Sequence, residues 1–228
     1  MALDYSQIEL RLAAHMSEDE KMIKAFKEGA DIHTATAAEI NQVKISEVTP
    51  EMRREAKAIN FGVLYGQGPH GLMQTADIPY QRAKEFIEKY FGVYAGIKNY
   101  IETSINIARE SGYAETLYER RRYLPELNSS IQMVKKAAER MAVNTPIQGT
   151  SADMLKVAMI KIYDLIKDKE DIKMLLQVHD ELVFEVATGK EKEYFVEIKN
   201  IMENIIKLRV PIIVEAKVGT NWGEMERI

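Results

Sequence analysis

The sequence predicts an α+β fold, and three observations support this prediction. Most of the 228 residues show the apolar spacing of amphipathic helices, a few short stretches are rich in β-forming residues, and acidic residues interrupt two of those stretches. The expected strands are one that ends near Asp4, a hairpin of residues 173–178 and 182–186, and a last strand at 211–218. A lone hairpin is not stable, so we expect these strands to form one sheet.

Helices are expected to fill most of the first half of the chain. The first should begin near residue 8 and place its apolar residues on one face. Ser17 with Glu20 has the spacing of a capping box for a second helix. Asp31 is a candidate N-cap for a third helix, which should continue to residue 40.

Proline and glycine residues mark the later elements. Thr49 and Pro50 can begin a helix that Gly66 ends, and Pro79 opens a long helical region that Gly112 ends. The elements expected after Gly112 are a small hairpin of residues 113–117 and 122–124 and helices at 131–143, 150–166 and 190–208.

The composition is that of a globular protein of one or two domains. Hydrophobic residues make up 46% of the chain, there is no cysteine, and no apolar run is long enough to span a membrane. Disulfides and thiolate metal sites are therefore excluded, no secretory leader is expected, and a cytoplasmic location is favoured. The net charge of −4 is unusual for a DNA-binding domain, but lysine and arginine gather locally at residues 53–57, 120–122 and 135–140.

Two acidic sequence motifs indicate a metal site. Asp4 and Asp180 each interrupt an apolar run where a strand would otherwise be buried. Acids at strand ends can converge in a fold and supply the oxygen ligands that hard divalent cations prefer. Enzymes commonly use two such cations to catalyse in-line displacement at phosphorus. The alternative is structural, since either aspartate could cap a helix or occupy a hairpin turn.

A row of four side chains lies between the two acids in the sequence. Arg53, Lys57, Phe61 and Tyr65 recur every four residues, so they share one face of the helix predicted at 49–65. In such a row the two cationic side chains can bind phosphates, and the aromatic rings that follow can stack on a base. An ordinary amphipathic helix with a basic, solvated end is the alternative.

Together these sequence motifs resemble the motifs of the bacterial DNA polymerase I enzymes, the family A DNA polymerases. The first match runs without a break from Asp4 to Arg11. The other matching residues are Arg53, Lys57, Phe61, Tyr65 and Gly66; Arg140, Asn144, Thr145, Pro146, Gln148, Gly149, Thr150 and Asp153; and Val178, His179, Asp180 and Glu181. The motifs occur in the family's order and cover the chain from Asp4 to Trp222.

The resemblance implies an antiparallel palm sheet with helices on one side and a mostly helical fingers subdomain. Residues 1–15 and 113–228 would form the palm, and residues 16–112 would be mostly fingers. The thumb and exonuclease-like domains of the family have no counterpart, so we expect a truncated fragment. We also expect weak, salt-sensitive DNA binding, and an exposed strand edge or apolar patch that favours weak self-association.

The implied chemistry is two-metal nucleotidyl transfer from a deoxynucleoside triphosphate to a primer 3′-hydroxyl. Asp4 and Asp180 would bind two Mg²⁺ ions, and Glu181 would serve as an auxiliary acid. Arg53 and Lys57 would neutralise the phosphates, and Lys57 is also a candidate proton donor to pyrophosphate.

Substrate selection is implied for further residues. Phe61 would pack against the incoming sugar and base, while Tyr65 and Glu9 are similar to the pair that excludes a ribose 2′-hydroxyl. His33 matches a position near the triphosphate, although a solvated histidine is the alternative. The full nucleotide-binding set is Arg53, Lys57, Phe61, Tyr65, Glu9, Gln7 and His33.

The implied DNA contacts come from Arg140, Asn144, Gln148 and His179. This group resembles the one that touches the minor-groove edge of the nascent base pair. Core packing is the alternative for Asn144 and Gln148, and Met141 and Met154 are assigned to the core. Residues 130–133 lack the basic and polar character common in relatives, so one DNA contact is expected to be lost.

Three functions remain open. They are template-directed DNA synthesis, a nucleotide- or DNA-binding fragment with little or no turnover, and a two-metal phosphohydrolase or nuclease. The row from Arg53 to Tyr65 argues against the third, because a nuclease has no need of a ring that selects deoxynucleotides. The expected partners are primer–template DNA and deoxynucleoside triphosphates, with no membrane and no obligate protein partner.

Overall fold

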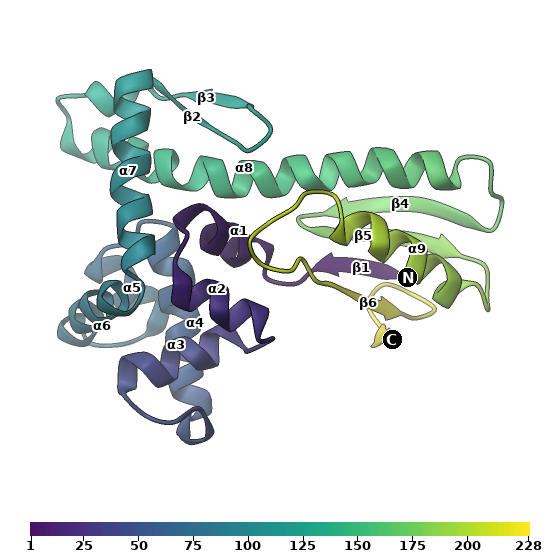
Figure 1. Ribbon diagram of the computed structural model, residues 1–228, viewed down its shortest axis with the longest axis horizontal. Coiled ribbons are helices and arrows are strands. Elements are labelled where there is room, and N and C mark those ends of the chain that lie inside the picture. The colour runs from purple at the N-terminus through teal and green to yellow at the C-terminus, as the bar shows by residue number, and fades with distance from the viewer.

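The sheet predicted around Asp4 forms at one end of the molecule, and a group of helices forms at the other end (Figure 1). The computed structural model describes residues 1–228 and has the predicted α+β fold. The sheet is antiparallel throughout, with strand order β4-β5-β1-β6-β7. Its strands are β1 (Ala2–Tyr5), β4 (Ile172–Val178), β5 (Glu181–Val186), β6 (Val214–Val218) and β7 (Glu226–Arg227).

Strand β1 joins the hairpin and the last strand in one sheet, as predicted, and lies at its centre between β5 and β6. Leu3 is fully buried there, and Asp4 lies opposite Glu181 of β5 and Glu215 of β6. The last predicted strand begins at Val214 rather than at residue 211, and the short β7 was not predicted. The central position of β1 fixes the direction in which Asp4 points relative to both neighbouring strands.

The helical group contains seven helices before the first hairpin. They are α1 (Ile8–Ser17), α2 (Glu20–Lys27), α3 (Ile32–Asn41), α4 (Pro50–Leu64), α5 (Pro69–Ala76), α6 (Tyr80–Val93) and α7 (Ala95–Ser111). The long helical region predicted after Pro79 is thus divided at Tyr94, and α5 was not predicted. Gly112 ends α7 with a φ of 82°, a backbone conformation that favours glycine.

Helix caps explain where several of these helices begin and end. Asp31 caps α3 as predicted, since its carboxylate accepts a hydrogen bond from the Thr34 amide. The prediction of a Ser17–Glu20 capping box for α2 is wrong. The helix starts at Glu20, so the adjacent Asp19 is the N-cap and accepts from the Met22 amide at 3.0 Å.

Helix α4 has the predicted signals at both ends. Thr49 accepts a hydrogen bond from the Met52 amide at 3.2 Å, and Pro50 occupies the first helical position. At the other end Gly66 has a φ of 69°, and its N–H bonds to the Val63 carbonyl. Glycine in this left-handed conformation ends α4, as the sequence predicted.

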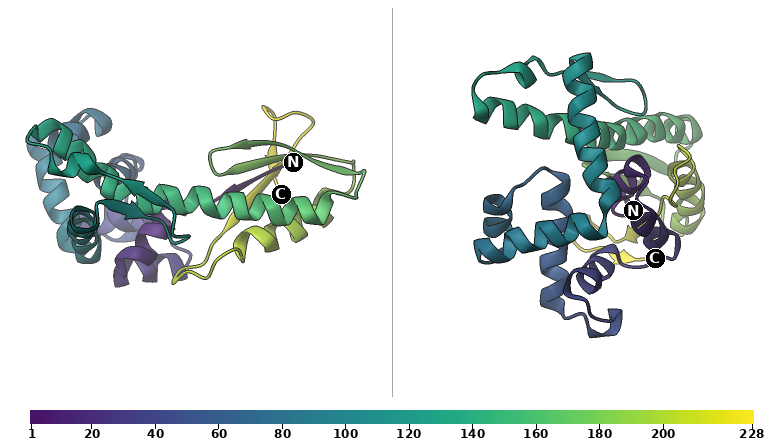
Figure 2. Two further views of the ribbon diagram at one scale, coloured as in Figure 1. Left: turned by 90° about the horizontal axis from the view of Figure 1, so that it is seen from above. Right: turned by 60° about the vertical axis from the view of Figure 1, so that its left-hand side comes forward.

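A single 35-residue helix, α8 (Gln132–Ile166), replaces the two helices predicted at 131–143 and 150–166. Pro146 lies inside it, where it cannot donate a backbone hydrogen bond to the preceding turn. Helix α8 runs beside both the helical group and the sheet (Figure 1), and α8 and α9 (Glu191–Glu203) cover the same face of the sheet (Figure 2). Helix α9 ends five residues earlier than predicted. The expectation for Met154 is confirmed, but Met141 is 38% exposed and lies beside Arg122 of the hairpin.

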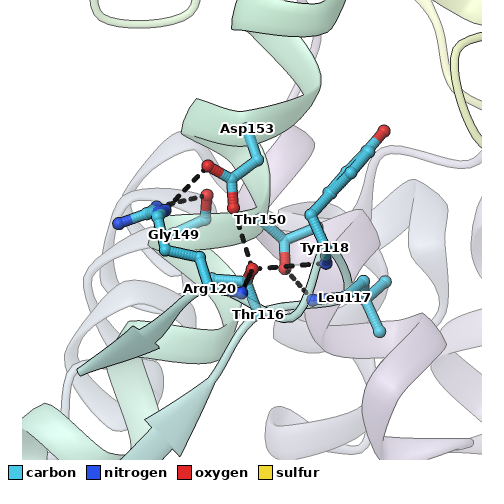
Figure 3. A network of polar contacts seen from close by, with 7 residues as sticks. All are labelled: Thr116, Leu117, Tyr118, Arg120, Gly149, Thr150 and Asp153. Atoms are coloured by element: carbon cyan, nitrogen blue, oxygen red, sulfur yellow. Dashed lines mark hydrogen bonds and ion pairs between the residues drawn. The ribbon is translucent and has the colours of Figure 1, made fainter. Parts of the chain in front are cut away.

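A polar network holds the β2–β3 hairpin (Tyr113–Glu115 and Arg121–Tyr123) against the turn of α8 that follows Pro146 (Figure 3). Asp153 accepts hydrogen bonds from Arg120 Nε and Thr116 Oγ1, both at 2.8 Å. Arg120 also donates to the Gly149 carbonyl at 3.0 Å, and Thr150 accepts from the Leu117 amide. The network therefore stabilises α8 next to the point where its own hydrogen bonding is interrupted.

One apolar core of 39 buried residues extends through the sheet and the helical group. No helix combines the length and the hydrophobicity that are needed to cross a membrane.

Gly149 gives a test of the contact between α8 and the hairpin. A Cβ atom at Gly149 would lie 2.5 Å from Thr116 Cγ2, so Gly149→Ala should destabilise the protein by about 1–3 kcal/mol. Without that clash, alanine in a helix would stabilise by roughly 0.5–1 kcal/mol relative to glycine. Thr116→Ser removes the clashing methyl group and keeps the hydroxyl, so Gly149→Ala in that background should be close to neutral. Chemical denaturation of the four proteins measures this, and equal losses in both backgrounds would contradict the contact.

Candidate functional site

The sheet brings the two predicted metal ligands together. The Tyr5 amide donates to the Asp180 carbonyl at 3.3 Å, and Asp4 lies opposite Glu181 in the β1–β5 ladder. Asp180 belongs to the turn between β4 and β5, next to His179, whose φ of 53° is unusual for a residue other than glycine. The strand pairing thus places three carboxylates at one end of the sheet.

The electrostatics of this end favour a bound cation. Burial, together with the nearby charges of Asp180 and Glu181, raises the pKa of Asp4 to about 6. Burial also raises the pKa of Asp180. The Oδ1 atom of Asp4 is buried and has no hydrogen-bond partner. An unpartnered oxygen among repelling carboxylates fits a hard divalent cation, which would satisfy the oxygen and offset the repulsion.

Two carboxylates alone cannot complete the coordination of such a cation. The structure contains no group of three or more histidine, cysteine, aspartate or glutamate side chains arranged as a ready metal site. Glu181 is directed elsewhere, since its Oε1 accepts a hydrogen bond from Trp222 Nε1 at 2.8 Å. This arrangement suits cations whose remaining ligands come from substrate and water, as Mg²⁺ bound to nucleotides requires. The contact with Trp222, the chain's one tryptophan, was not predicted from the sequence.

The row on α4 faces outward as predicted. Arg53 and Lys57 are exposed, and the rings of Phe61 and Tyr65 are stacked with centroids 6.1 Å apart. Arg53 forms an ion pair of 2.6 Å with Asp31, the residue that caps α3. Burial alone would raise the pKa of Asp31, but hydrogen bonds from Arg53 and Thr34 outweigh it and lower this pKa to about 2. The guanidinium is therefore held in place beside the α3 terminus.

His33 lies on α3 beside this row. Its ring centroid is 5.7 Å from that of Phe61, and the residue is only 3% exposed, so the solvated alternative is wrong. Burial is the main cause that lowers the pKa of His33 to about 4; the charge of Asp31 opposes it, and the charges of Arg53 and Lys57 act in the same direction as burial. The imidazole is therefore neutral at pH 7.

Glu9 and Tyr65 meet as the resemblance implied. The Tyr65 hydroxyl donates a hydrogen bond to Glu9 Oε2, joining the end of α4 to the first turn of α1. Gln148 of α8 lies near the Tyr65 hydroxyl, and burial raises the pKa of both Tyr65 and Glu9. Gln7 is the N-cap residue of α1, with a left-handed φ of 54°. These contacts place α1, α4 and α8 around one point close to Asp180.

The predicted DNA-contacting residues of α8 lie on its side nearest to α4. A Cβ atom at Gly66 would be 2.8 Å from Arg140 Cγ, so the end of α4 packs closely on Arg140. Gln148 is exposed, and core packing does not account for it. Asn144 is half-buried, and its Oδ1 has no hydrogen-bond partner. His179 is exposed at the carboxylate end of the sheet.

Comparison with known proteins agrees with this geometry. The sequence profile described as DNA polymerase family A matches residues 1–224. The chain belongs to this family. It is 49% identical over 223 residues to DNA polymerase I of Caldicellulosiruptor bescii and 48% identical over 222 residues to the thermostable DNA polymerase I of Thermus aquaticus.

These alignments cover 97% of the chain but 26% and 27% of the two family A relatives. The chain therefore spans about a quarter of the length of the curated relatives it matches. A solved structure of the POL domain of Pol1 from M. smegmatis, in complex with DNA primer-template and dNTP, superposes with a TM-score of 0.89 at 46% identity. That alignment covers 93% of this chain and 38% of the other.

The raised pKa of Asp4 predicts an unusual dependence of stability on pH. The folded protein keeps this proton up to about pH 6, whereas the unfolded chain releases it near the ordinary value of 3.8. The free energy of unfolding should therefore fall as the pH rises from about 4 to 6. In the absence of divalent cations, Asp4→Asn should stabilise the protein at pH 7 by about 1–2 kcal/mol, after allowance for partial exposure. This gain should vanish below about pH 4.

Asp171→Asn is the matched control. The hydrogen bond from Tyr194 lowers the pKa of Asp171, so that substitution should reduce stability at pH 7. Thermal denaturation in a chelator across this pH range measures both variants. A loss of stability in Asp4→Asn at pH 7 would contradict the proposed repulsion.

Proposed function

We propose that the chain carries the nucleotidyl-transfer site of a DNA-directed DNA polymerase. In the reaction, the primer 3′-oxygen bonds to the α-phosphorus of a deoxynucleoside triphosphate while the bond to the leaving pyrophosphate breaks. The observation that carries the proposal is the convergence of Asp4, with its unpartnered oxygen, and Asp180 at the sheet end beside Glu9 and Tyr65. In this proposal residues 1–15 and 113–228 are palm and residues 16–112 are mostly fingers.

Asp4 and Asp180 would hold two Mg²⁺ ions, which lower the pKa of the attacking hydroxyl and stabilise the leaving pyrophosphate. The carboxylates supply the negative charge that keeps both cations at one place. Glu181, which Trp222 holds, would act as an auxiliary acid outside the permanent ligand set.

The exposed cations of α4 would neutralise the triphosphate. Arg53 already has a geometry fixed by Asp31, and a phosphate can share its remaining donors. Lys57 lies one turn further along the same face and can donate a proton to pyrophosphate. Their spacing places positive charge where the transition state gains negative charge.

Selection of the sugar and base falls to the aromatic end of the row. The ring of Phe61 offers a face for the incoming sugar and base, with Gln7 at the nearby start of α1. The hydrogen bond between Tyr65 and Glu9 fills the space that a ribose 2′-hydroxyl would need. Deoxynucleotides would therefore be preferred.

Primer–template DNA is the proposed macromolecular partner. Arg140, Gln148 and His179 present donors on the α4 side of α8 and at the sheet end, where minor-groove acceptors are common to all correct pairs. Asn144 would use its unpartnered amide in the same groove. The second candidate is nucleotide or DNA binding without useful turnover, because the chain spans about a quarter of its relatives.

Primer extension tests the proposal. With Mg²⁺ and all four deoxynucleotides, the chain should lengthen a labelled primer, and Asp180→Ala should remove nearly all of this activity because one acid cannot hold both cations. Asp168→Ala, an exposed aspartate on the loop after α8, is the control and should extend normally. Unchanged primers would favour the binding fragment, and shortened primers would favour a nuclease. Activity of Asp180→Ala within about tenfold of the parent, or ~1.4 kcal/mol, would refute its assignment as a ligand.

Glu9→Ala tests the sugar gate. The substitution opens space beside the Tyr65 hydroxyl, so use of ribonucleotides relative to deoxynucleotides should rise by about tenfold or more, or ~1.4 kcal/mol. The overall rate should fall because Tyr65 loses its partner. The ratio of kcat/KM values for the two substrates gives the answer, and an unchanged ratio would place the gate elsewhere.

A further inference from the structure

Three carboxylates form a row across the sheet at the candidate cation site. Asp4 lies opposite Glu181 of β5 on one side and opposite Glu215 of β6 on the other. Residues that are directly opposite in an antiparallel pair share one face of the sheet, with Cβ atoms about 4.5–5.5 Å apart. The next residue of β1, Leu3, is buried on the other face. Either outer carboxylate is therefore close enough to join a cation that binds Asp4.

The C-terminal segment holds both outer carboxylates. In the loop between β6 and β7, Trp222 Nε1 donates a hydrogen bond to Glu181 Oε1 at 2.8 Å. Beyond this loop, Arg227 forms an ion pair of 3.0 Å with Glu215. Because β1 lies between β5 and β6, Trp222 reaches over β1 on the face that carries Asp4. Asp4, in contrast, keeps a buried oxygen that has no hydrogen-bond partner.

The loop that carries Trp222 is tightly closed. A Cβ atom at Gly219 would lie 2.1 Å from the Glu224 carbonyl oxygen, so any other residue at this position requires the backbone to shift. Asn221 donates to the Glu224 carboxylate at 2.8 Å and accepts from the Gly223 amide at 3.0 Å. These contacts constrain the backbone on both sides of Trp222, and the direction of its indole N–H is set by the loop.

We propose that Trp222 is a positioning residue, which holds Glu181 away from the cations so that Asp4 and Asp180 alone bind them. Mg²⁺ in nucleotide sites is bound through one or two carboxylates together with substrate phosphates and water. A third carboxylate would occupy coordination positions that the triphosphate and the primer oxygen need. This inference rests on the proposed function for the use of the cations, but not for the position of Glu181.

The indole N–H signal of Trp222 reports the hydrogen bond directly. The chain has one tryptophan, so the ¹⁵N spectrum of the 228-residue protein contains one such signal. Its exchange with solvent should be slow in the parent and faster in Glu181→Ala, which removes the acceptor. Excess Mg²⁺ should leave the exchange slow, because Glu181 stays with Trp222. If Mg²⁺ instead raises the exchange rate to that of Glu181→Ala, Glu181 leaves the indole for the cation and the proposal is overturned.

The affinity for Mn²⁺ in the absence of nucleotide measures the consequence. Trp222→Phe keeps an aromatic ring and removes the donor, so Glu181 should join the cation and binding should tighten by about tenfold, the size of a hydrogen bond to a charged group. Gly219→Ala, which forces the loop to shift, should change the affinity in the same direction. Arg109→Gln removes a hydrogen bond to Glu139, on helices away from the sheet end, and should have no effect. Electron paramagnetic resonance of free Mn²⁺ gives these affinities.

A second background shows whether Trp222 acts through Glu181. In Glu181→Ala, the further change Trp222→Phe should leave the Mn²⁺ affinity unchanged. Equal tightening in both backgrounds, or no tightening in Trp222→Phe alone, would overturn the proposal. Primer extension keeps this inference separate from the proposed function. A parent that gives the expected indole and Mn²⁺ results but extends no primer would refute the polymerase function and leave the role of Trp222 standing.

Discussion

The pairing of β1 between β5 and β6 is the constraint on which the site depends. It forces Asp4 to lie beside Asp180 and opposite Glu181, in a place where burial makes their mutual repulsion costly. A fold selected for stability alone would avoid such an arrangement, because each of these carboxylates would be better solvated elsewhere. The sheet tolerates it because the fully buried Leu3 and its neighbours anchor β1 in the apolar core. Bound cations would offset this electrostatic repulsion between the carboxylates.

Three helices bring polar side chains to this negative centre. Helix α1 follows β1 directly, so Glu9 lies close to the carboxylates, and the hydrogen bond from Tyr65 ties the end of α4 to that point. Helix α8 completes the arrangement from the third side, where Gln148 meets Tyr65 and Arg140 packs on Gly66. The network around Asp153 holds α8 against the β2–β3 hairpin, just beyond Pro146. Each connection joins elements that are distant in the sequence.

Local signals in the sequence predicted what local physics determines. The caps at Asp31 and Thr49, the glycine end at Gly66 and the four-residue row on α4 were all predicted correctly, because each depends on neighbouring residues alone. The unbroken α8 was not, since tertiary contacts from Arg120 and Thr116 offset the lost hydrogen bond at Pro146. The exposure of Met141 and the burial of His33 depend on which helices pack against them. The contact of Trp222 with Glu181 could not be identified either, because nothing in the sequence next to Trp222 marks the group that it contacts.

The central claim is that Asp4 and Asp180 together bind divalent cations. Titration of the ¹⁵N-labelled chain with substoichiometric Mn²⁺ tests it most directly, because the paramagnetic ion broadens the amide signals of residues close to it. The account predicts that the signals of residues 3–5 and 179–181 broaden first, that excess Mg²⁺ restores them, and that Asp4→Asn loses the effect. Broadening spread evenly over exposed carboxylates, with residues 3–5 and 179–181 unaffected, would contradict it.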